Sequence, residues 1–478
     1  MDQLSAENQS HYGRLWDYFR NPQSPQAGAA AGDNARPYRQ AQEVGLPSRI
    51  TGTERCGARK PTDLARKEVV IENDIGWRVG TMVDFLFGKK PSIRSLAADA
   101  TTAATVEKVV DALLEANGGH AFLQEMAMLG SVYGFVDVAL RGTGVLPANG
   151  ATPARADSAV EAARGLQLEA VEAPRVLPIL EEYDYRRVRF WVQRFHVHPS
   201  KLSQWRRPWM GMFSRARGGP KPTAVEVVEV LSPTWWQRYE DRALAAEGPN
   251  ALGRVPIVHV QNLALTGSYA GLSDVEPLVP LQDELNTRLS DRAQRVTYQS
   301  FRMYLGKGID DFLERPVGPG QMWATQNLAA SIEEFGADSG SPSEDAHIQE
   351  VRAAMDKVSS VSPLAAGLVQ GNVGYLTSAT ALKVLLGGLL ARTARKRLTY
   401  GQGLAQIVDM ALDWLDRAGV QHTTAADRRI EIHWPNVVPT DESEMLRNAQ
   451  IKAQLGLPRE QVLAELGYSR DQRAATSD

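Results

Sequence analysis

The chain has 478 residues, of which 43% are hydrophobic and 23% charged, a composition typical of a folded protein with about two to four domains. Its net charge of -3 argues against a dedicated nucleic-acid-binding protein, because neutralisation of phosphates by basic residues supplies most of the affinity in that class. The single cysteine, Cys56, excludes an intrachain disulfide, and we expect neither secretion nor a membrane span, since the sequence has no signal-peptide pattern and no apolar run of about 18 residues.

The first 61 residues predict a short helix followed by an arm. Residues 1–20 can form one amphipathic helix that uses Tyr12, Leu15, Trp16 and Phe19. Residues 21–60 are rich in proline, glycine, alanine and glutamine, which is typical of an extended segment without a core of its own. Such an arm either stays mobile or docks on a neighbouring subunit.

Three helices and a strand are predicted before residue 142. Apolar residues at a spacing of three or four predict the helices, which use 71–86, 106–114 and 122–129. Alternation of apolar residues predicts a strand over 133–141. Residues 142–167 are rich in alanine, glycine and proline and therefore predict a surface insertion.

A block rich in strands is predicted next. The strand-like segments are 187–197, 225–231 and 255–260. Four tryptophans lie in or between these segments: Trp205, Trp209, Trp235 and Trp236. We interpret them as core or interface residues rather than as a platform on which bases stack.

The pattern changes to long helices after residue 272. Ser273 suits an N-cap, Glu276 stands three residues later, and Pro277 falls in the first turn. The helix has a narrow apolar stripe, formed by Leu278, Leu281, Leu285, Leu289, Ala293 and Val296. A narrow stripe predicts packing against other rods rather than inside a globule. A turn-rich, β-like module over 301–345 and a second helix follow, and the second helix has heptad-like spacing at Ile348, Val351, Met355 and Val358.

A glycine-rich loop and one very long helix form the next segment. The loop covers 369–376, and the helix is predicted from Thr377 or Ser378 to Arg417, where Ala418 and Gly419 stop it. At 1.5 Å per residue this helix is a rod of roughly 60 Å. Glycines inside the helix, at 387–388 and at 401 and 403, predict a kink or a close approach of neighbouring elements. A flexible loop on a rigid rod indicates a moving part rather than a substrate pocket.

The last 60 residues predict a strand and two helices. Residues 429–434 alternate as a strand, which we expect to return to the earlier β-rich block. From Asp441 the chain predicts two helices, divided by Gly456 and Pro458.

The sequence shows no motif that predicts catalysis, a cofactor or a metal. It contains no phosphate-binding P-loop, no H-E-x-x-H, no paired C-x-x-C and no G-x-S-x-G. His196 and His198 could share one face of a metal site, but we interpret them as two half-exposed strand histidines. The one dense basic cluster, residues 392–397, has two interpretations: a solvated or subunit-interface patch, or a band that faces phosphates or pairs with acids.

These segments, in this order, resemble the portal protein family of tailed bacteriophages, in its siphovirus-like branch. The motifs that carry the resemblance are 73–91, ending in Gly88-Lys89-Lys90-Pro91; 129–134; 254–258 followed by 271–276; Gly371-Asn372 followed by 378–383; and 430–434 followed by 439–441. Together they cover roughly residues 62–470. Ala379 departs from the pattern, since many relatives have glycine there. The arm and the 142–167 insertion are not explained by it.

The resemblance implies an α+β, mainly helical fold with the parts of a portal. By analogy, residues 1–61 are the arm, partly flexible, and 62–272 are the first part of an α/β wing. Residues 273–299 and 346–361 are the two stem helices, and 300–345 are a small α/β clip. Residues 362–377 are the tunnel loop, 378–440 are the long channel-lining helix with the second part of the wing, and 441–478 are a helical crown.

The resemblance also implies a function. The family forms rings, usually of twelve subunits, at one capsid vertex of the virion, which carry double-stranded DNA during packaging and ejection. Expected partners are further copies of the chain, the terminase large subunit, a head–tail adaptor, and the major capsid and scaffolding proteins, with assembly in the host cytoplasm. The DNA-facing residues of the tunnel loop would be Gln370, Gly371, Asn372, Gly374 and Tyr375, and a possible basic channel band would use Arg392, Arg395 and Lys396.

Two other hypotheses about the function remain open at this point. A structural or scaffold ring without DNA passage would show no central channel. An enzyme, such as a nuclease, is disfavoured by the lack of converging polar residues; metal-dependent DNA cleavage lost on mutation of His196 or His198 would support it.

Overall fold

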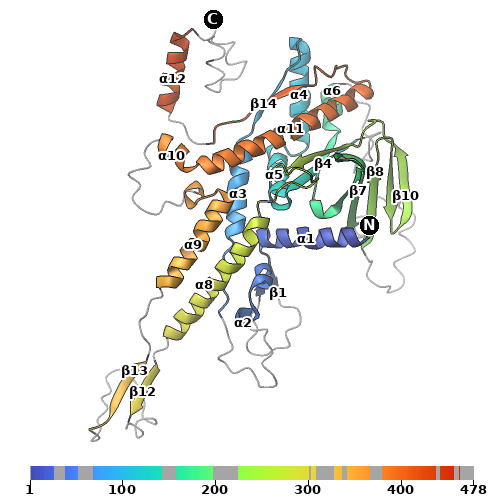
Figure 1. Cartoon of the computed structure of the whole chain (residues 1–478). Helices are drawn as coiled ribbons and strands as arrows, with labels where there is room; N and C mark the ends of the chain where they lie inside the picture. Colours follow the sequence, from blue (N-terminus) through green and yellow to red (C-terminus); the bar gives the residue numbers. More distant parts are fainter. Residues whose placement is uncertain are drawn as a thin grey trace, which may run out of the picture. The chain divides into compact units, whose positions relative to one another are not determined.

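The computed structural model describes residues 2–25, 38–51, 68–142, 158–197, 224–300, 303–307, 328–335, 342–366, 379–437, 442–456 and 462. They form a mixed fold with more residues in helices than in strands, as the sequence predicted (Figure 1). The chain divides into two compact units, each of which is described by itself. Unit 1 comprises Met1–Leu15, Arg78–Glu276 and Ser359–Asp478, and unit 2 comprises Trp16–Trp77 and Pro277–Val358.

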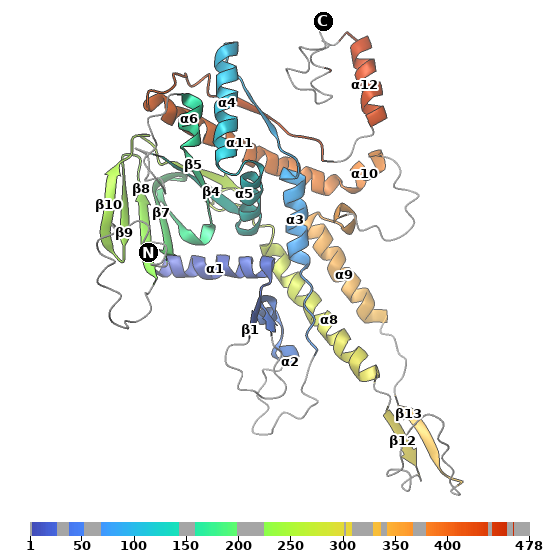
Figure 2. The same ribbon diagram turned by 180° about the vertical axis from the view of Figure 1, so that it is seen from behind.

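A three-stranded antiparallel sheet lies at the centre of unit 1. Its strand order is β11 (Ile257–Gln261), β4 (Phe135–Arg141) and β5 (Gln167–Val171). All seven residues of β4 are buried, and both α5 (His120–Tyr133) and α11 (Gly387–Arg417) contact the sheet (Figure 2). The strand predicted at 133–141 is therefore confirmed as the most buried strand of the unit.

A five-stranded antiparallel sheet forms a second layer of unit 1. Its order is β10 (Ala243–Pro249), β9 (Trp235–Glu240), β8 (Val225–Leu231), β7 (Asp184–Val197) and β6 (Val176–Glu181). The sequence predicted β7 and β8 but missed β6, β9 and β10, which lack a long apolar alternation. Trp235 and Trp236 are half-buried in β9, whereas Trp205 and Trp209 lie outside the described residues.

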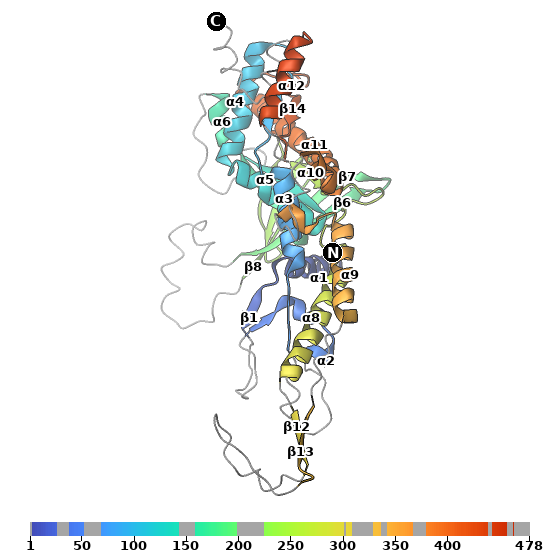
Figure 3. The same ribbon diagram turned by 90° about the vertical axis from the view of Figure 1, so that its left-hand side faces the viewer.

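Helices α3 (Asp74–Phe87) and α4 (Ala100–Ala116) confirm two further predictions, but the insertion prediction is wrong in its second half. Residues 159–164 form α6, which contacts α4 (Figure 3), and the 3-10 turn η3 (Ala173–Arg175) follows β5. Ala163 and Leu166 are 0% and 1% exposed. Alanine is small and helix-forming, so an alanine-rich segment can pack closely against another helix as well as form a loop.

The long helix is divided into α10 (Ala379–Leu385) and α11. Leu386 lies between them, and the glycines at 387 and 388 follow, so the kink predicted from these glycines is observed. The predicted close approach is also observed, because a Cβ at Gly403 would lie 2.4 Å from Val260 Cγ2 of β11. At the other end, Gly419 has φ +73° and the Val420 N–H donates to Leu415 O, which is the expected glycine stop.

The prediction for the next strand is wrong in its partner. Strand β14 (Ile430–His433) pairs antiparallel with β3 (Ser92–Ser95), a strand that was not predicted, and not with the β-rich block. The C-terminal helix α12 (Glu442–Gln454) agrees with the first predicted crown helix. Of the second crown helix only Val462 lies within the described residues.

Unit 2 contains two long helices and a hairpin. After the 3-10 turn η5 (Glu276–Leu278), α8 (Val279–Ser300) and α9 (Pro342–Ser359) lie side by side in Figures 1 and 2, and η7 (Pro363–Ala366) follows in unit 1. Of the predicted heptad residues, Ile348, Val351 and Met355 are buried, whereas Val358 is 39% exposed. Strands β12 (Met303–Lys307) and β13 (Ser331–Phe335) pair as the hairpin between the helices.

The buried face of α8 is not the predicted apolar stripe alone. Leu278 and Leu285 are buried, but Val296 is 53% exposed. A polar row at a spacing of four is buried instead: Gln282, Asn286 and Ser290, all 0% exposed. Burial of amides requires hydrogen-bond partners, and these come from the N-terminal part of the chain.

The part of the predicted arm that belongs to unit 2 docks on α8 of its own chain. The described arm consists of α1 (Asp2–Arg20), which spans the boundary of the units at Leu15, and of β1 (Gln23–Pro25), β2 (Tyr38–Gln40), η1 (Ala41–Gly45) and α2 (Ser48–Thr51) in unit 2. Gln42 is 0% exposed; its Oε1 accepts from Asn286 Nδ2 at 3.0 Å and its Nε2 donates to Asn73 Oδ1 at 3.1 Å. Arg49 also pairs with Asp291 at 2.6 Å. Residues 38–51 are therefore an ordered part of unit 2, which neither predicted alternative anticipated.

Substitution of Asn286 by alanine is expected to loosen this attachment. Asn286 donates to Gln42 and accepts from the Glu72 N–H at 3.0 Å, so its loss leaves buried polar groups unsatisfied, at a cost of about 1–3 kcal/mol. Hydrogen exchange at residues 38–51 should become faster. Thr287→Ala is the matched control, because Thr287 is buried on the same helix and, among the described residues, its hydroxyl bonds only the Asp283 carbonyl. Equal acceleration in both variants would contradict the assignment.

Candidate functional site

The structure separates the two groups of predicted site residues. The DNA-facing residues of the tunnel loop, Gln370, Gly371, Asn372, Gly374 and Tyr375, lie outside the described residues, so this part of the site stays a prediction. The basic cluster lies on α11, within unit 1, and its geometry is defined. The side chains of this basic cluster differ in their burial and in their partners.

Asp274 forms ion pairs with two of the basic side chains of α11. Lys396 Nζ lies 2.5 Å from Asp274 Oδ2, and Arg392 Nη2 lies 2.6 Å from Asp274 Oδ1. Asp274 and Lys396 are each 1% exposed. The carboxylate follows Ser273, whose Oγ accepts from the Val275 and Glu276 N–H groups, as the predicted cap requires. One buried carboxylate therefore joins the segment before the first stem helix to the long helix.

Neutral polar groups complete this buried cluster. Lys396 Nζ donates to Ser131 Oγ at 2.9 Å, and Asn262 Nδ2 donates to Asp274 Oδ2 at 2.9 Å. Tyr400 OH lies 3.3 Å from Asn262 Oδ1. The backbone takes part as well, since the Asp274 N–H donates to Ser131 O at 2.8 Å. Each ionised group is thus hydrogen-bonded as well as paired, which is the condition under which a buried ion pair is tolerated.

The electrostatics of the cluster favour an ionised Asp274. Burial would raise the pKa of Asp274, but the charges of Lys396 and Arg392 outweigh it and hold the pKa below its usual range. Burial lowers the pKa of Lys396, and Asp274 offsets this only in part. Burial, together with the charge of Asp274, raises the pKa of Tyr400 well above its ordinary value, so this hydroxyl stays neutral.

The three residues of the predicted basic channel band differ in their surroundings, and whether they face a channel stays a prediction. Arg392 and Lys396 direct their charges to Asp274 inside unit 1, which corresponds to the acid-pairing interpretation of the basic cluster. Arg395 alone of the three is exposed, and the ion pairs of the described residues do not include it. The sequence pattern could not separate these residues, because all three belong to one short basic run.

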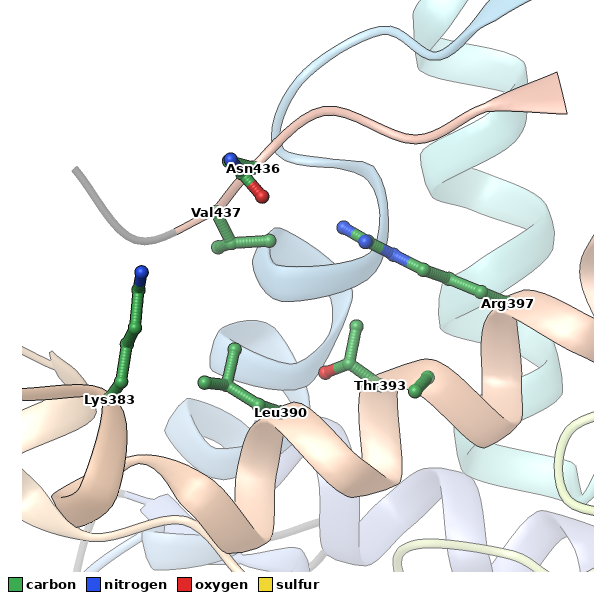
Figure 4. A pocket seen from close by; sticks show the side chains of 7 residues that line it. Lys383, Leu390, Thr393, Arg397, Asn436 and Val437 are labelled. Atoms are coloured by element: carbon green, nitrogen blue, oxygen red, sulfur yellow. The ribbon is translucent and has the colours of Figure 1, made fainter. Parts of the chain in front are cut away.

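A second group of cations surrounds a small pocket of unit 1 (Figure 4). The pocket has a volume of about 130 Å³ and is lined by Lys383 of α10, Leu390, Thr393 and Arg397 of α11, and Asn436 and Val437 after β14. Figure 4 shows Lys383 and Arg397 rising from the helices on either side of Leu390 and Thr393, toward the segment that carries Asn436 and Val437. None of the described residues that line this pocket has a carboxylate.

A second buried polar cluster, around Asp137, was not predicted from the sequence. The Asp137 carboxylate of β4, 0% exposed, accepts from Trp191 Nε1 at 2.7 Å and Tyr269 OH at 2.9 Å and lies 2.6 Å from His259 Nδ1. Burial and the charge of Asp137 raise the pKa of Tyr12 to about 12. Because Trp191, Tyr269 and His259 all pair with the Asp137 carboxylate, this arrangement is typical of a structural core. Only the position of a charged residue within a buried strand could have indicated it.

The described residues contain no group of three or more histidines, cysteines or acids that could hold a metal ion. His196 is exposed on β7, and His198 lies outside the described residues. None of the helices in the described ranges is long and apolar enough to cross a bilayer.

The chain can be compared with protein families, curated proteins and solved structures. The model of the family of phage portal proteins described as SPP1 Gp6-like matches residues 223–475. No curated protein matches the chain. Among solved structures, the chain is similar to one from the neck of an empty gene transfer agent particle, with a TM-score of 0.45 and 14% identity over 88% of this chain and 99% of that chain. It is also similar to one from the virion of a native gene transfer agent particle, with a TM-score of 0.41 and 13% identity over 95% of this chain and 99% of that chain.

Proposed function

The chain belongs to the family of SPP1 Gp6-like phage portal proteins, and we propose that it forms a ring-shaped channel at one vertex of a capsid, through which double-stranded DNA is packaged and ejected. In this proposal the ring holds about twelve copies, docks the terminase large subunit during packaging, and later binds the head–tail adaptor. The major capsid and scaffolding proteins surround it in a particle assembled in the host cytoplasm. The proposal includes no enzymatic activity and no cofactor.

The family assignment supports a separate role for each segment of the chain. Helices α8 and α9 would be the stem, the β12–β13 hairpin would belong to the clip, and α12 to the crown. Residues 362–377 would be the tunnel loop, with Gln370, Asn372 and Tyr375 facing the duplex. Glycines in that loop would permit movement against a passing duplex, and a polar loop in a nearly neutral chain would limit binding to phosphates and hence friction.

The exposed surface of the long helix supports assembly into a ring. Val384 of α10 and Gly388, Ala391 and Leu398 of α11 are exposed at helical spacing, and exposed Arg395 lies on the same row of α11. Val384 is 75% exposed and Leu398 is 68% exposed. Exposed apolar residues aligned on one face are typical of an interaction surface, and a head-to-tail contact that closes into a ring would cover the same face in every copy.

The mass of the purified assembly tests this proposal. We expect a particle of about twelve times the 52.4 kDa chain mass, with a central channel visible by electron microscopy. Leu398→Glu should convert it into smaller species with unchanged helical circular dichroism, because this exposed side chain places a charge on the proposed contact. Leu244→Glu is the control, since Leu244 is 50% exposed on β10, away from the helix.

Three outcomes would count against the proposal. A monomer or dimer under all conditions would contradict the ring. A ring without a channel would favour a scaffold function without DNA passage. Equal effects of Leu398→Glu and Leu244→Glu on the mass would show that the exposed face of the long helix has no special role.

A further inference from the structure

The pocket between α10, α11 and residues 436–437 contains cations without a counter-charge. Within the described residues, neither Lys383 nor Arg397 forms an ion pair, in contrast to Arg392 and Lys396, which share Asp274. Lys89 adds a further positive charge nearby, since its Nζ donates to the Asn436 carbonyl at 3.2 Å. A chain with a net charge of -3 therefore concentrates uncompensated positive charge at one concave place.

Arg397 is held in position while part of its guanidinium stays unused. Its Nη2 donates to Pro435 O at 3.0 Å, and its Cζ lies 5.3 Å from the centre of the Trp434 ring. Its Nε is buried and has no hydrogen-bond partner among the described residues. Burial lowers the pKa of Arg397, but a guanidinium remains charged in proteins. An unsatisfied, partly buried cation gains most from an anionic oxygen that accepts its free N–H.

The size of the pocket limits the ligand to a single group. A volume of about 130 Å³ is below the range of roughly 300–1,000 Å³ that is typical of sites for small molecules. Lys383 reaches in from α10 and Arg397 from α11, and the Asn436 side chain lies at the mouth between them (Figure 4). Donors on separate elements around a small hollow suit one phosphate or carboxylate group.

The position of Lys383 in the sequence favours phosphate. Helix α10 begins at Ala379, directly after the segment that contains the proposed DNA-facing residues. Lys383 stands four residues later, which is about 6 Å along a helix axis. A cation this close to the end of the proposed tunnel loop would meet the same duplex as the loop.

We infer that this pocket is a contact site for a backbone phosphate of double-stranded DNA, with Lys383 and Arg397 as its charged donors. The inference rests on the proposed function, since the duplex is the one that the channel would carry. It differs from the basic band predicted from the sequence: Arg392 and Lys396 share one carboxylate, Asp274, whereas Lys383 and Arg397 have no ion-pair partner among the described residues. Few free charges in each copy keep the contact weak enough for DNA to move.

The test measures binding of a fluorescently labelled DNA duplex to the purified assembly over a salt series. Lys383→Gln should weaken binding at low salt and reduce the slope of log K against log salt by at least about 1, because one phosphate contact is lost per engaged subunit. Lys383 is exposed, so this variant should fold normally. Lys108→Gln is the control: it removes an exposed cation of α4 in the same unit that does not line the pocket, and its slope should equal that of the wild type.

A conservative variant separates geometry from charge. Arg397→Lys keeps the positive charge but removes the forked donor, so it should weaken binding with little change in slope. The inference is wrong if Lys383→Gln and Lys108→Gln have the same effect, or if the wild-type assembly shows no salt-dependent binding of the duplex. It is also wrong if Lys383→Gln changes the mass of the assembly and leaves DNA binding intact, since the pocket would then contact a second copy of the chain. In the first two cases an intact ring would leave the proposed function standing.

Discussion

Replacement of Asp274 by alanine is expected to lower the free energy of unfolding of unit 1 by about 3–5 kcal/mol, which is typical of removing one partner from a buried ion pair. The variant leaves Lys396, 1% exposed, without its carboxylate and takes the acceptor from Arg392. The loss should exceed that of an ordinary surface substitution several-fold. Denaturant unfolding followed by circular dichroism measures it, with wild type and variant compared in the same state of assembly.

A matched surface variant and a double-mutant cycle make this result specific. Asp84→Ala removes an exposed acid of unit 1 and should change stability by less than about 0.5 kcal/mol. Lys396→Met removes the buried cation while keeping a long side chain. If the pair accounts for the effect, the double variant Asp274→Ala/Lys396→Met should lose less than the sum of the two single losses. Additive losses would show that Asp274 acts through something other than Lys396.

The pH dependence of the same difference follows from the lowered pKa of Asp274. In the unfolded chain an aspartate has a pKa of about 3.9, and in the folded protein Lys396 and Arg392 hold the pKa of Asp274 below its usual range. The stabilisation is therefore complete above the unfolded pKa and is lost as the pH falls through the folded pKa. The difference between wild type and Asp274→Ala should therefore shrink as the pH falls from about 5 to below about 4; a constant difference down to strongly acidic pH would contradict this assignment.

The sequence predicted elements whose signals are local. Periodicity located α3, α4 and α5, the cap at Ser273 followed from its neighbours, and Gly419 marked the end of the long helix. These features depend on residues within one or two turns, so one sequence contains the information. The kink after Leu386 and the close approach at Gly403 were predicted for the same reason, since glycine lacks the Cβ that would prevent them.

Pairings over long distances could not be predicted in the same way. Asp274 and Lys396 are 122 positions apart, and each appears in the sequence as an ordinary polar residue of a cap or a basic run. The buried row Gln282, Asn286 and Ser290 appeared as the solvated face of a helix, because its partner Gln42 lies in a segment with the composition of an arm. The polarity of a residue predicts its exposure only where no other polar segment of the chain covers that residue.

Replacement of Gly134 by alanine is expected to destabilise unit 1 by about 2–5 kcal/mol. Gly134 ends α5 with φ +93°, a left-handed conformation that costs roughly 1–2 kcal/mol for a residue with a Cβ. The new Cβ would lie 2.5 Å from the Gly271 carbonyl oxygen, which belongs to backbone and cannot rotate away, and relief of such crowding costs about 1–3 kcal/mol more. Denaturant unfolding measures the sum.

Gly419→Ala separates the two contributions. Gly419 has a similar conformation, φ +73°, but a Cβ there meets nothing within 4 Å, so only the conformational cost of about 1–2 kcal/mol should appear. Equal losses in the two variants would show that the contact between Gly134 and Gly271 contributes nothing.

The contact at Gly134 also predicts a coupling to the ionic cluster. Just before Gly134, Val132 O accepts from Ser273 Oγ at 2.6 Å and Ser131 O accepts from the Asp274 N–H at 2.8 Å, so a shift of residues 271–274 would move Asp274 away from Lys396. Gly134→Ala should therefore weaken the ion pair as well as strain the backbone. In the double variant Gly134→Ala/Asp274→Ala the loss should be smaller than the sum of the single losses by at least about 0.5 kcal/mol, because part of the pair is already lost. Strict additivity would mean that residues 271–274 adapt to the new methyl group without moving the carboxylate.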